Sequence, residues 1–300
     1  MGRKLVLLCL LLCLLLCLLA AGACAEEQLA PLPIGGPAPY APDPDCFDAD
    51  GWGYQDESIT VRAEEIRRYD TDITVVRVTV KDPSQVRTAM AGKYPSKTAR
   101  PASVQGENNR AVLTLSGDFF SYHNQGIVMR SGVLYRNSPH KGRDTLMIDW
   151  NGDFTILHPT TKESFAPYQD SIREAFCFGP GLVIDGVKLD SLEEVTISCG
   201  AKHGAVRMVI GQTGPLSYLA FASEGPEHEG SKGLTILEAA DVAYELGCIN
   251  AYNLDGGATA TICIGDQQIS SYWRQKERSI GDIIYFATLV PSGAEEETHE

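Results

Sequence analysis

Residues 253–257 read Asn-Leu-Asp-Gly-Gly, and the rest of the chain can be interpreted outward from them. Apolar runs at 248–252 and 258–264 flank this stretch and predict buried strands on both sides. Adjacent glycines allow positive φ and close approach of the backbone to a ligand, and their N–H groups can then face an anion. A carboxylate there can serve as acid, base or nucleophile. Because Asp and Gly are also ordinary turn residues, the stretch predicts either a catalytic turn or a simple strand connection.

A helix leads into this stretch. Thr235 and Glu238 have the spacing of a capping box, an apolar face recurs with helical period over 235–246, and Gly247 is a C-terminal stop. The preceding chain shows alternation and turn pairs that are typical of strands, with hairpins expected at 126–136, 144–157 and 206–222. The predicted fold is α+β: β-rich, with a mostly antiparallel or mixed sheet and one prominent helix around 235–246.

The first 25 residues are typical of a secretory signal peptide. Arg3 and Lys4 precede a Leu-rich run, and Ala23-Cys24-Ala25 fits a cleavage site. Cleavage there predicts a secreted or extracytoplasmic protein without a transmembrane span, whereas Cys24 leaves lipoprotein anchoring as an alternative. The expected organisation is a signal peptide at 1–25, a flexible Pro-rich linker at 26–54, the domain at 55–290 and an acidic tail at 291–300.

Charge and motif spacing exclude several classes of function. The net charge of −14 becomes −16 without Arg3 and Lys4, which argues against nucleic acid or an anionic membrane as main partner. No CxxC or HExxH spacing occurs, so neither a metal site nor a cofactor is expected. The acidic cluster at 43–50 does not have Ca²⁺-loop spacing, although surface Ca²⁺ stays open. Of the cysteines after residue 25, Cys177 with Cys199 is the pairing to test.

Three acids follow apolar strands: Asp118, Glu224 and Asp255. Two carboxylates at one sheet edge are what glycoside hydrolysis uses, although acids at strand ends also shape turns. Arg207 lies inside an apolar stretch and therefore needs an anionic partner, either a structural carboxylate or a substrate phosphate.

Other cations and imidazoles carry weaker signals. Arg278 follows Arg274 and Lys276 at alternating positions, which indicates either an anion-attracting patch or a solvated strand face. His123 and His203 have no partner at a recognisable spacing, and we interpret both as surface histidines.

Seven short motifs, in order, resemble those of the phosphodiester glycosidase family. The resemblance covers roughly residues 55 to 288. The motifs are Ser-Gly-Asp-Phe-Phe at 116–120, the Gly…Arg-Ser-Gly-Val-Leu-Tyr-Arg block at 126–136, Phe-Gly-Pro-Gly-Leu-Val at 178–183, Arg207 to Gly211, Gly-Leu-Thr at 233–235, the stretch at 253–257, and Glu-Arg-Ser-Ile at 277–280.

The resemblance implies a secreted hydrolase that cleaves a sugar-1-phosphodiester, such as an N-acetylglucosamine-1-phosphodiester, in cell-wall or exopolysaccharide metabolism. The implied partner is a phosphorylated glycan. By the same resemblance, the catalytic carboxylates are Asp118 and Asp255, Arg207 meets the phosphate, two backbone N–H groups come from Gly256 and Gly257, and the sugar is oriented by Ser116, Glu224 and Arg278.

The chain departs from the family pattern within these motifs. The family's Asn before Gly-Asp is Ser116 here, and the Pro and Thr around its Arg are Val206 and Met208. Its Asp-Gly-Arg segment appears as Ser223-Glu224-Gly225, and a further glycine is Ala258. These changes support an alternative: a non-catalytic protein on the same fold that binds a phosphoglycan or cell-wall glycan.

Overall fold

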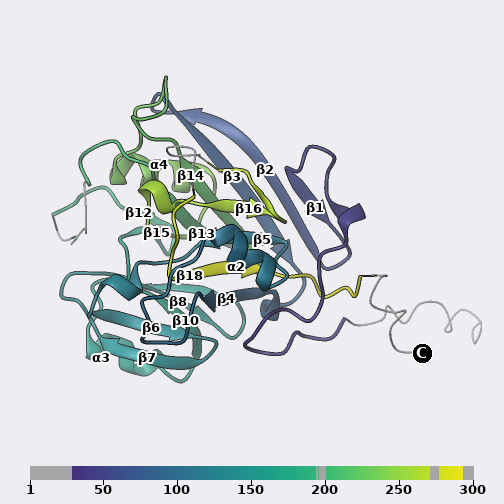
Figure 1. Cartoon of the computed structure of the whole chain (residues 1–300). Coiled ribbons are helices and arrows are strands. Elements are labelled where there is room, and N and C mark those ends of the chain that lie inside the picture. The colour runs from purple at the N-terminus through teal and green to yellow at the C-terminus, as the bar shows by residue number, and fades with distance from the viewer. Residues whose placement is uncertain (1–28, 194, 196–200, 271–276, 293–300) are drawn as a thin grey trace, which may run out of the picture. The chain divides into compact units, whose positions relative to one another are not determined.

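The fold is taken from a computed structural model, drawn in Figure 1, that describes residues 29–193, 195, 201–270 and 277–292. The residues from Pro31 onward belong to one structural unit, and their strands form three sheets whose pairs are all antiparallel. The predicted β-rich α+β class is therefore confirmed.

The largest sheet has eight strands. Their order across the sheet is β1 (Gly53–Gln55), β2 (Ile59–Arg68), β3 (Thr71–Val80), β14 (Ser217–Ser223), β13 (Met208–Gly214), β15 (Asn250–Leu254), β11 (Gly181–Ile184) and β12 (Val187–Lys188).

Both faces of the central strands β3, β14, β13, β15 and β11 are largely buried, which is why most of these strands read as nearly continuous apolar runs, whereas β2 is exposed along much of its length. Along β3, Val76 and Val78 point into the central core, while Ile73 and Val75 point to the other face. Helix α4 (Ile236–Glu245) covers that other face and shares its hydrophobic cluster. The helix begins as predicted, since the Thr235 and Glu238 side chains form a capping box.

The two smaller sheets have five strands each. One has the order β7 (Val133–Ser138), β6 (Gly126–Arg130), β10 (Ile172–Phe176), β8 (Thr145–Asp149) and β9 (Phe154–Leu157). The other has the order β17 (Gln267–Gln268), β16 (Ile262–Ile264), β5 (Leu113–Ser116), β18 (Asp282–Phe286) and β4 (Val86–Met90). Short helices are α2 (Ala102–Asn108) and α3 (Lys162–Phe165), with 3₁₀ turns at Pro44–Cys46, Pro83–Gln85, Phe120–Tyr122, Ala166–Tyr168 and Gly257–Thr259.

Local turn chemistry explains the hairpins. Ser131 and Gly132 both have positive φ, of 51° and 77°, and connect β6 to β7. The pairs β8–β9 and β13–β14 also form where the sequence predicts them. Helix α2 was not predicted, because its seven residues are too few to show an amphipathic period.

Strand β18 fits between β5 and β4, which come far earlier in the chain (Figure 1). Ile283 lies opposite Ser116 on one side, and Asp282 lies opposite Met90 on the other. This insertion brings Asp282 beside the Ser-Gly-Asp motif that follows β5.

The segment before β1 differs from the flexible linker expected there. The Leu32 N–H donates to Ser84 Oγ at 2.8 Å, and Arg87 Nη2 donates to the carbonyls of Gly35 and Gly36. The Tyr285 hydroxyl also donates to Gly36 O at 3.1 Å. Residues 31–46 are therefore packed on the domain.

The expected signal peptide and most of the acidic tail lie outside the described residues, as does Cys199. Cys177 is buried, and it forms no disulfide with any cysteine in the described residues. In the ranges that the structure describes, no helix has the length and apolar character needed to cross a membrane.

Candidate active site

Arg207 and Asp255 lie just beyond the ends of two paired strands, β13 and β15, of the eight-stranded sheet. Strand β13 pairs with β15 so that Met208 lies opposite Leu254, and the next residues outward are Arg207 and Asp255. The Gly257 N–H donates to Val206 O at 3.1 Å, which continues this pairing past the strand ends. The register of a buried antiparallel pair thus brings a cation and an acid to the same end of the strand pair.

Asp255 is the acid whose surroundings suit chemistry near neutral pH. Burial and, to a lesser extent, the nearby charge of Asp118 raise the pKa of Asp255 from 3.8 to about 6. Hydrogen bonds from Thr259 and from the Gly256 N–H oppose this rise, as does the charge of Arg278. Titratable groups with such shifts, held by a specific set of neighbours, are typical of functional sites.

The two glycines beside Asp255 are needed for the close approach and the conformation of the backbone there. A side chain at Gly256 would place its Cβ only 2.4 Å from Val206 O, so the backbones could not approach as they do. Gly257 has φ of +64°, which favours glycine. The Gly256 N–H supports the Asp255 carboxylate, and the Gly257 N–H is taken by Val206 O. The N–H groups expected to face a ligand thus hold the acid and its loop in place.

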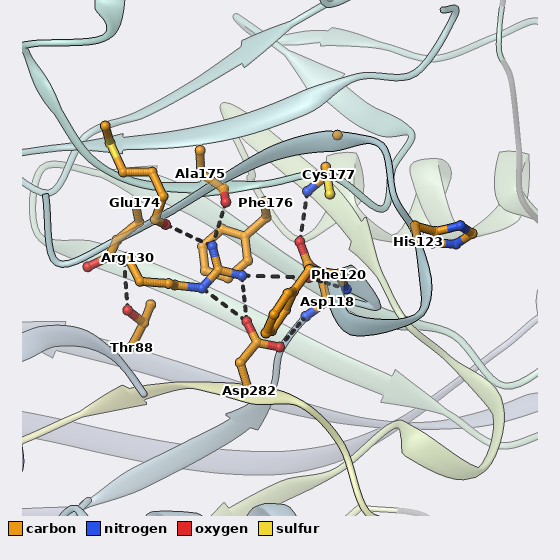
Figure 2. Close-up of polar contacts among 12 residues, drawn as sticks. Thr88, Asp118, Phe120, His123, Arg130, Glu174, Ala175, Phe176, Cys177 and Asp282 are labelled. Atoms are coloured by element: carbon orange, nitrogen blue, oxygen red, sulfur yellow. Dashed lines mark hydrogen bonds and ion pairs between the residues drawn. The ribbon is translucent and has the colours of Figure 1, made fainter. Parts of the chain in front are cut away.

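Asp118 is fully enclosed, with its side chain 0% exposed. Its Oδ1 accepts from the Phe120 N–H at 2.8 Å, and its Oδ2 accepts from the Cys177 N–H at 2.9 Å (Figure 2). Both oxygens are thus committed to the backbone. This geometry favours an anchoring and electrostatic role for Asp118 over direct contact with a substrate.

A buried ion cluster, formed by Arg130, Asp282 and Asp118, lies behind the site (Figure 2). Arg130 Nη2 lies 2.5 Å from Asp282 Oδ2 and 3.6 Å from Asp118 Oδ1, and its guanidinium lies over the Phe176 ring, 4.0 Å from the centroid. Burial raises the pKa of Asp282 to about 7 although Arg130 opposes the rise. The sequence patterns do not single out Arg130 and Asp282 as partners, because the two residues are 152 positions apart.

Gly117 is needed because of this cluster. A Cβ added there would lie 2.4 Å from Asp282 Oδ1 and 2.5 Å from its carboxyl carbon. The Asp118 N–H also donates to Asp282 Oδ1 at 3.1 Å. The Ser-Gly-Asp motif therefore fits around a carboxylate that β18 supplies.

Arg278 and Glu224 lie near the same strand ends. Arg278 is exposed, and its charge acts on Asp255. Its position is fixed by Glu277, whose carboxylate accepts from the N–H and hydroxyl of Ser103 at the start of α2. Glu224 follows β14 and lies 3.7 Å from His228 Nδ1. The strand face expected at 272–276 falls outside the described residues.

Ser116 has a structural position. It is 1% exposed, and its Oγ accepts from the Thr261 N–H at 3.2 Å, so it joins β5 to the segment before β16. The structure thus places it in the sheet that carries Asp118, without the exposure that a sugar contact needs.

Arg207 is largely committed to the protein itself. Its Nε donates to Leu234 O at 2.8 Å and its Nη2 to His203 O at 3.0 Å. It is buried, and its own N–H donates to Ser223 Oγ at 2.9 Å. These contacts assign Arg207 mainly to holding the 203–207 segment beside the entry to α4.

The chain is similar in sequence to a known protein family and to one curated protein. Residues 109–287 match the phosphodiester glycosidase family. The SPbeta prophage-derived uncharacterized protein YomE of Bacillus subtilis (strain 168) is 21% identical over 183 residues, which are 59% of this chain. The match spans only 28% of that relative's length.

Two solved structures have the same fold. The catalytic domain of zebrafish N-acetylglucosamine-1-phosphodiester alpha-N-acetylglucosaminidase, auto-inhibited by its pro-peptide, superposes with a TM-score of 0.59 and 16% identity, covering 88% of this chain and 98% of that one. A hypothetical protein from Synechocystis superposes with a TM-score of 0.53 and 15% identity, covering 76% of this chain and 62% of that one.

Proposed function

The chain belongs to the phosphodiester glycosidase family, and we propose that it hydrolyses a sugar-1-phosphodiester to a free sugar and a phosphate monoester. One observation carries this proposal: Asp255, with its pKa raised to about 6, lies within the field of Arg278 and of the buried Asp118. The name of the zebrafish relative suggests N-acetylglucosamine-1-phosphodiester as the first substrate to try.

The proposed reaction needs little from the protein beyond charge and position. Water adds to the anomeric carbon, the bond from that carbon to the phosphate oxygen breaks, and the phosphate monoester leaves with the bonding electrons. A carboxylate near the anomeric carbon stabilises the oxocarbenium-like state, and a cation stabilises the departing phosphate. We assign Asp255 the carboxylate role, while Asp118 and Gly256 set its pKa and place it.

Purified protein incubated with a sugar-1-phosphodiester tests the proposal. We expect free reducing sugar to accumulate with the parent chain, and Asp255→Asn to abolish it. A matched control is Asp266→Asn, which changes an exposed acid in the β16–β17 turn and should leave the rate unchanged. A parent chain that binds the substrate but releases no sugar would contradict hydrolysis.

A second candidate function is non-catalytic binding of a phosphoglycan or cell-wall glycan. The changes at Ser116, Glu224 and Ala258 relative to the family pattern favour it. Combining Ser116→Asn with Ala258→Gly discriminates the two: the double variant should raise the turnover of a weak enzyme and leave a pure binding protein inactive.

We further propose that the protein works outside the cytoplasm, on cell-wall or exopolysaccharide material. The Leu-rich run after Arg3 and Lys4 supports this proposal. Mass spectrometry of the protein's N-terminus after expression in its host would test it. A start at Glu26 is expected, a lipid-modified Cys24 would indicate an anchored form outside the cytoplasm, and an uncleaved N-terminus would contradict the proposal.

A further inference from the structure

One cation near the site has no anionic partner among the described residues. Arg143 precedes β8 and is half-buried. Its Nε is buried without a hydrogen-bond partner, and none of the ion pairs in the described ranges includes it. A cation removed from water costs free energy unless a partner compensates it. The position of Arg143 therefore points to a partner that comes from outside the chain.

His123 shares this environment, and the interpretation of it as a surface histidine does not fit the structure. Its Nε2 is buried without a hydrogen-bond partner in the described chain. Its ring packs edge-on against Phe119, with centroids 5.0 Å apart. Burial lowers its pKa below 6.5, and the charges of Arg143 and Arg136 lower it further. At neutral pH His123 is an uncharged imidazole beside a cation.

A continuous set of contacts links these two side chains to the strand that carries Asp255. Phe119, which packs on His123, also contacts the Phe178 ring, with centroids 6.5 Å apart. The adjacent Gly179 accepts a hydrogen bond from Asn253 Nδ2 at 2.9 Å.

Asp144, the residue after Arg143, contacts the same loop. A Cβ added to Gly179 would lie 3.7 Å from the Asp144 N–H nitrogen, next in the chain to Arg143. Asp144 Oδ2 also accepts from the Gly181 N–H at 2.8 Å, which fixes the loop around Gly179. The charge of Asp118 acts on both His123 and Asp255, and the charge of Arg143 acts on His123, so these groups surround the same buried acid.

We propose that Arg143 and His123 form the phosphate-binding subsite of the active site and hold a non-bridging oxygen of the substrate's phosphodiester. The inference rests on the proposed function and replaces Arg207, whose Nε and Nη2 donate to the chain's own carbonyls. A phosphate oxygen only accepts hydrogen bonds, so it can receive the Arg143 Nε–H and a proton on His123 Nε2 together.

This arrangement predicts how binding depends on pH. In the free protein, Arg143, Arg136 and His140 lower the pKa of His123, and Asp118 raises it. A bound phosphate adds negative charge and raises that pKa, so the complex takes up a proton. Phosphate affinity should therefore increase as pH falls toward the pKa of His123 in the complex.

Calorimetric titration of the full chain with inorganic phosphate tests the subsite without turnover. Arg143→Gln should weaken binding about tenfold or more, because a charge-assisted hydrogen bond is lost. Arg143→Lys should recover part of it, and His123→Gln should abolish the pH dependence. Arg62→Gln is the matched control, since this exposed arginine on β2 pairs with Asp48 away from the site. Melting curves of each variant separate lost binding from lost folding.

Turnover of the phosphodiester distinguishes the subsite from the function. The subsite predicts a raised KM for Arg143→Gln together with a lower kcat, because the same cation holds the phosphate and stabilises it as it departs. Phosphate binding that needs Arg143, in a chain that hydrolyses no phosphodiester, would support the subsite and overturn the hydrolase. Hydrolysis with an unchanged KM in folded Arg143→Gln, or phosphate binding that depends on Arg278 instead, would overturn the subsite while the hydrolase stands.

Discussion

Replacing Asp255 by Asn should stabilise the protein above pH 6 and abolish its turnover. Asn keeps the size of the side chain and can still accept hydrogen bonds from Thr259 and the Gly256 N–H. It cannot ionise, so it escapes the cost of holding a charge in a largely buried place beside Asp118. The same change removes the carboxylate that the proposed reaction uses, so stability and activity should move in opposite directions.

The magnitude follows from the shift in pKa. The pKa of Asp255 rises from 3.8 to about 6 in the folded protein, and each unit corresponds to about 1.4 kcal/mol of free energy. Because the side chain is partly exposed, solvent screening reduces the effect, and we expect about 2 kcal/mol. For a domain of this size that is roughly a 4–8 °C increase in Tm.

The sign depends on pH. A carboxyl whose folded-state pKa is raised contributes its full stability below the unfolded value near 3.8, and this contribution is lost as pH rises through about 6. Asp255→Asn should therefore melt with the parent at pH 4 and above it at pH 7.5. If the ionised acid is needed, kcat/KM of the parent should rise with pH through the same region, and Asn should reduce it by about 10³-fold or more.

Differential scanning calorimetry at pH 4 and 7.5, beside a reducing-sugar assay, measures both effects. Turnover near that of the parent would refute the catalytic assignment. A lower Tm at pH 7.5 would refute the electrostatic reasoning even if turnover were lost. The exposed control Asp266→Asn should change neither quantity.

Three further variants test the buried ion cluster and the cap of helix α4. Gly117→Ala places a Cβ 2.4 Å from Asp282 Oδ1 and should cost about 2–3 kcal/mol in urea unfolding; a loss near zero would show that the carboxylate moves freely. Arg130→Met leaves Asp118 and Asp282 buried without their cation and should cost about 3–5 kcal/mol at pH 7, but less at pH 4, where Asp282, whose pKa is raised to about 7, is protonated; an equal loss at both pH values would contradict this account. Thr235→Ala removes the α4 cap and should cost about 1 kcal/mol by denaturant titration, with Thr235→Ser close to the parent; equal losses in both would rule out the cap.

Much of the fold could be predicted because its signals are local. The capping box of Thr235 and the Ser131-Gly132 turn depend on neighbours within a few residues, and both form as predicted. The packing of residues 31–46 could not be predicted, because its prolines resemble a linker in composition. What holds the segment is a set of distant donors such as Arg87, about 50 residues away.

The candidate site, too, was predictable where its signals are local and not where it depends on long-range contacts. Residues 253–257 marked Asp255, since an acid beside two glycines after a strand is visible in the sequence. The partners of each residue depend on strand register, which cannot be read from the sequence alone. Thus the placement of Arg207 and Asp255 at the ends of neighbouring strands follows from the β13–β15 pairing, and the Asp118 N–H donates to Asp282, which is 164 residues away.

The central place of β18 has a consequence for the way the chain folds during synthesis. Four strands of its sheet are made before residue 282, yet β5 and β4 have no partner on their facing edges until β18 arrives. Such long-range pairing gives a high contact order and slow folding, and the sheet cannot close until β18 has been synthesised. A chain ending before 282 and a separate peptide carrying β18 should therefore behave as complementary fragments that recover the fold only when mixed.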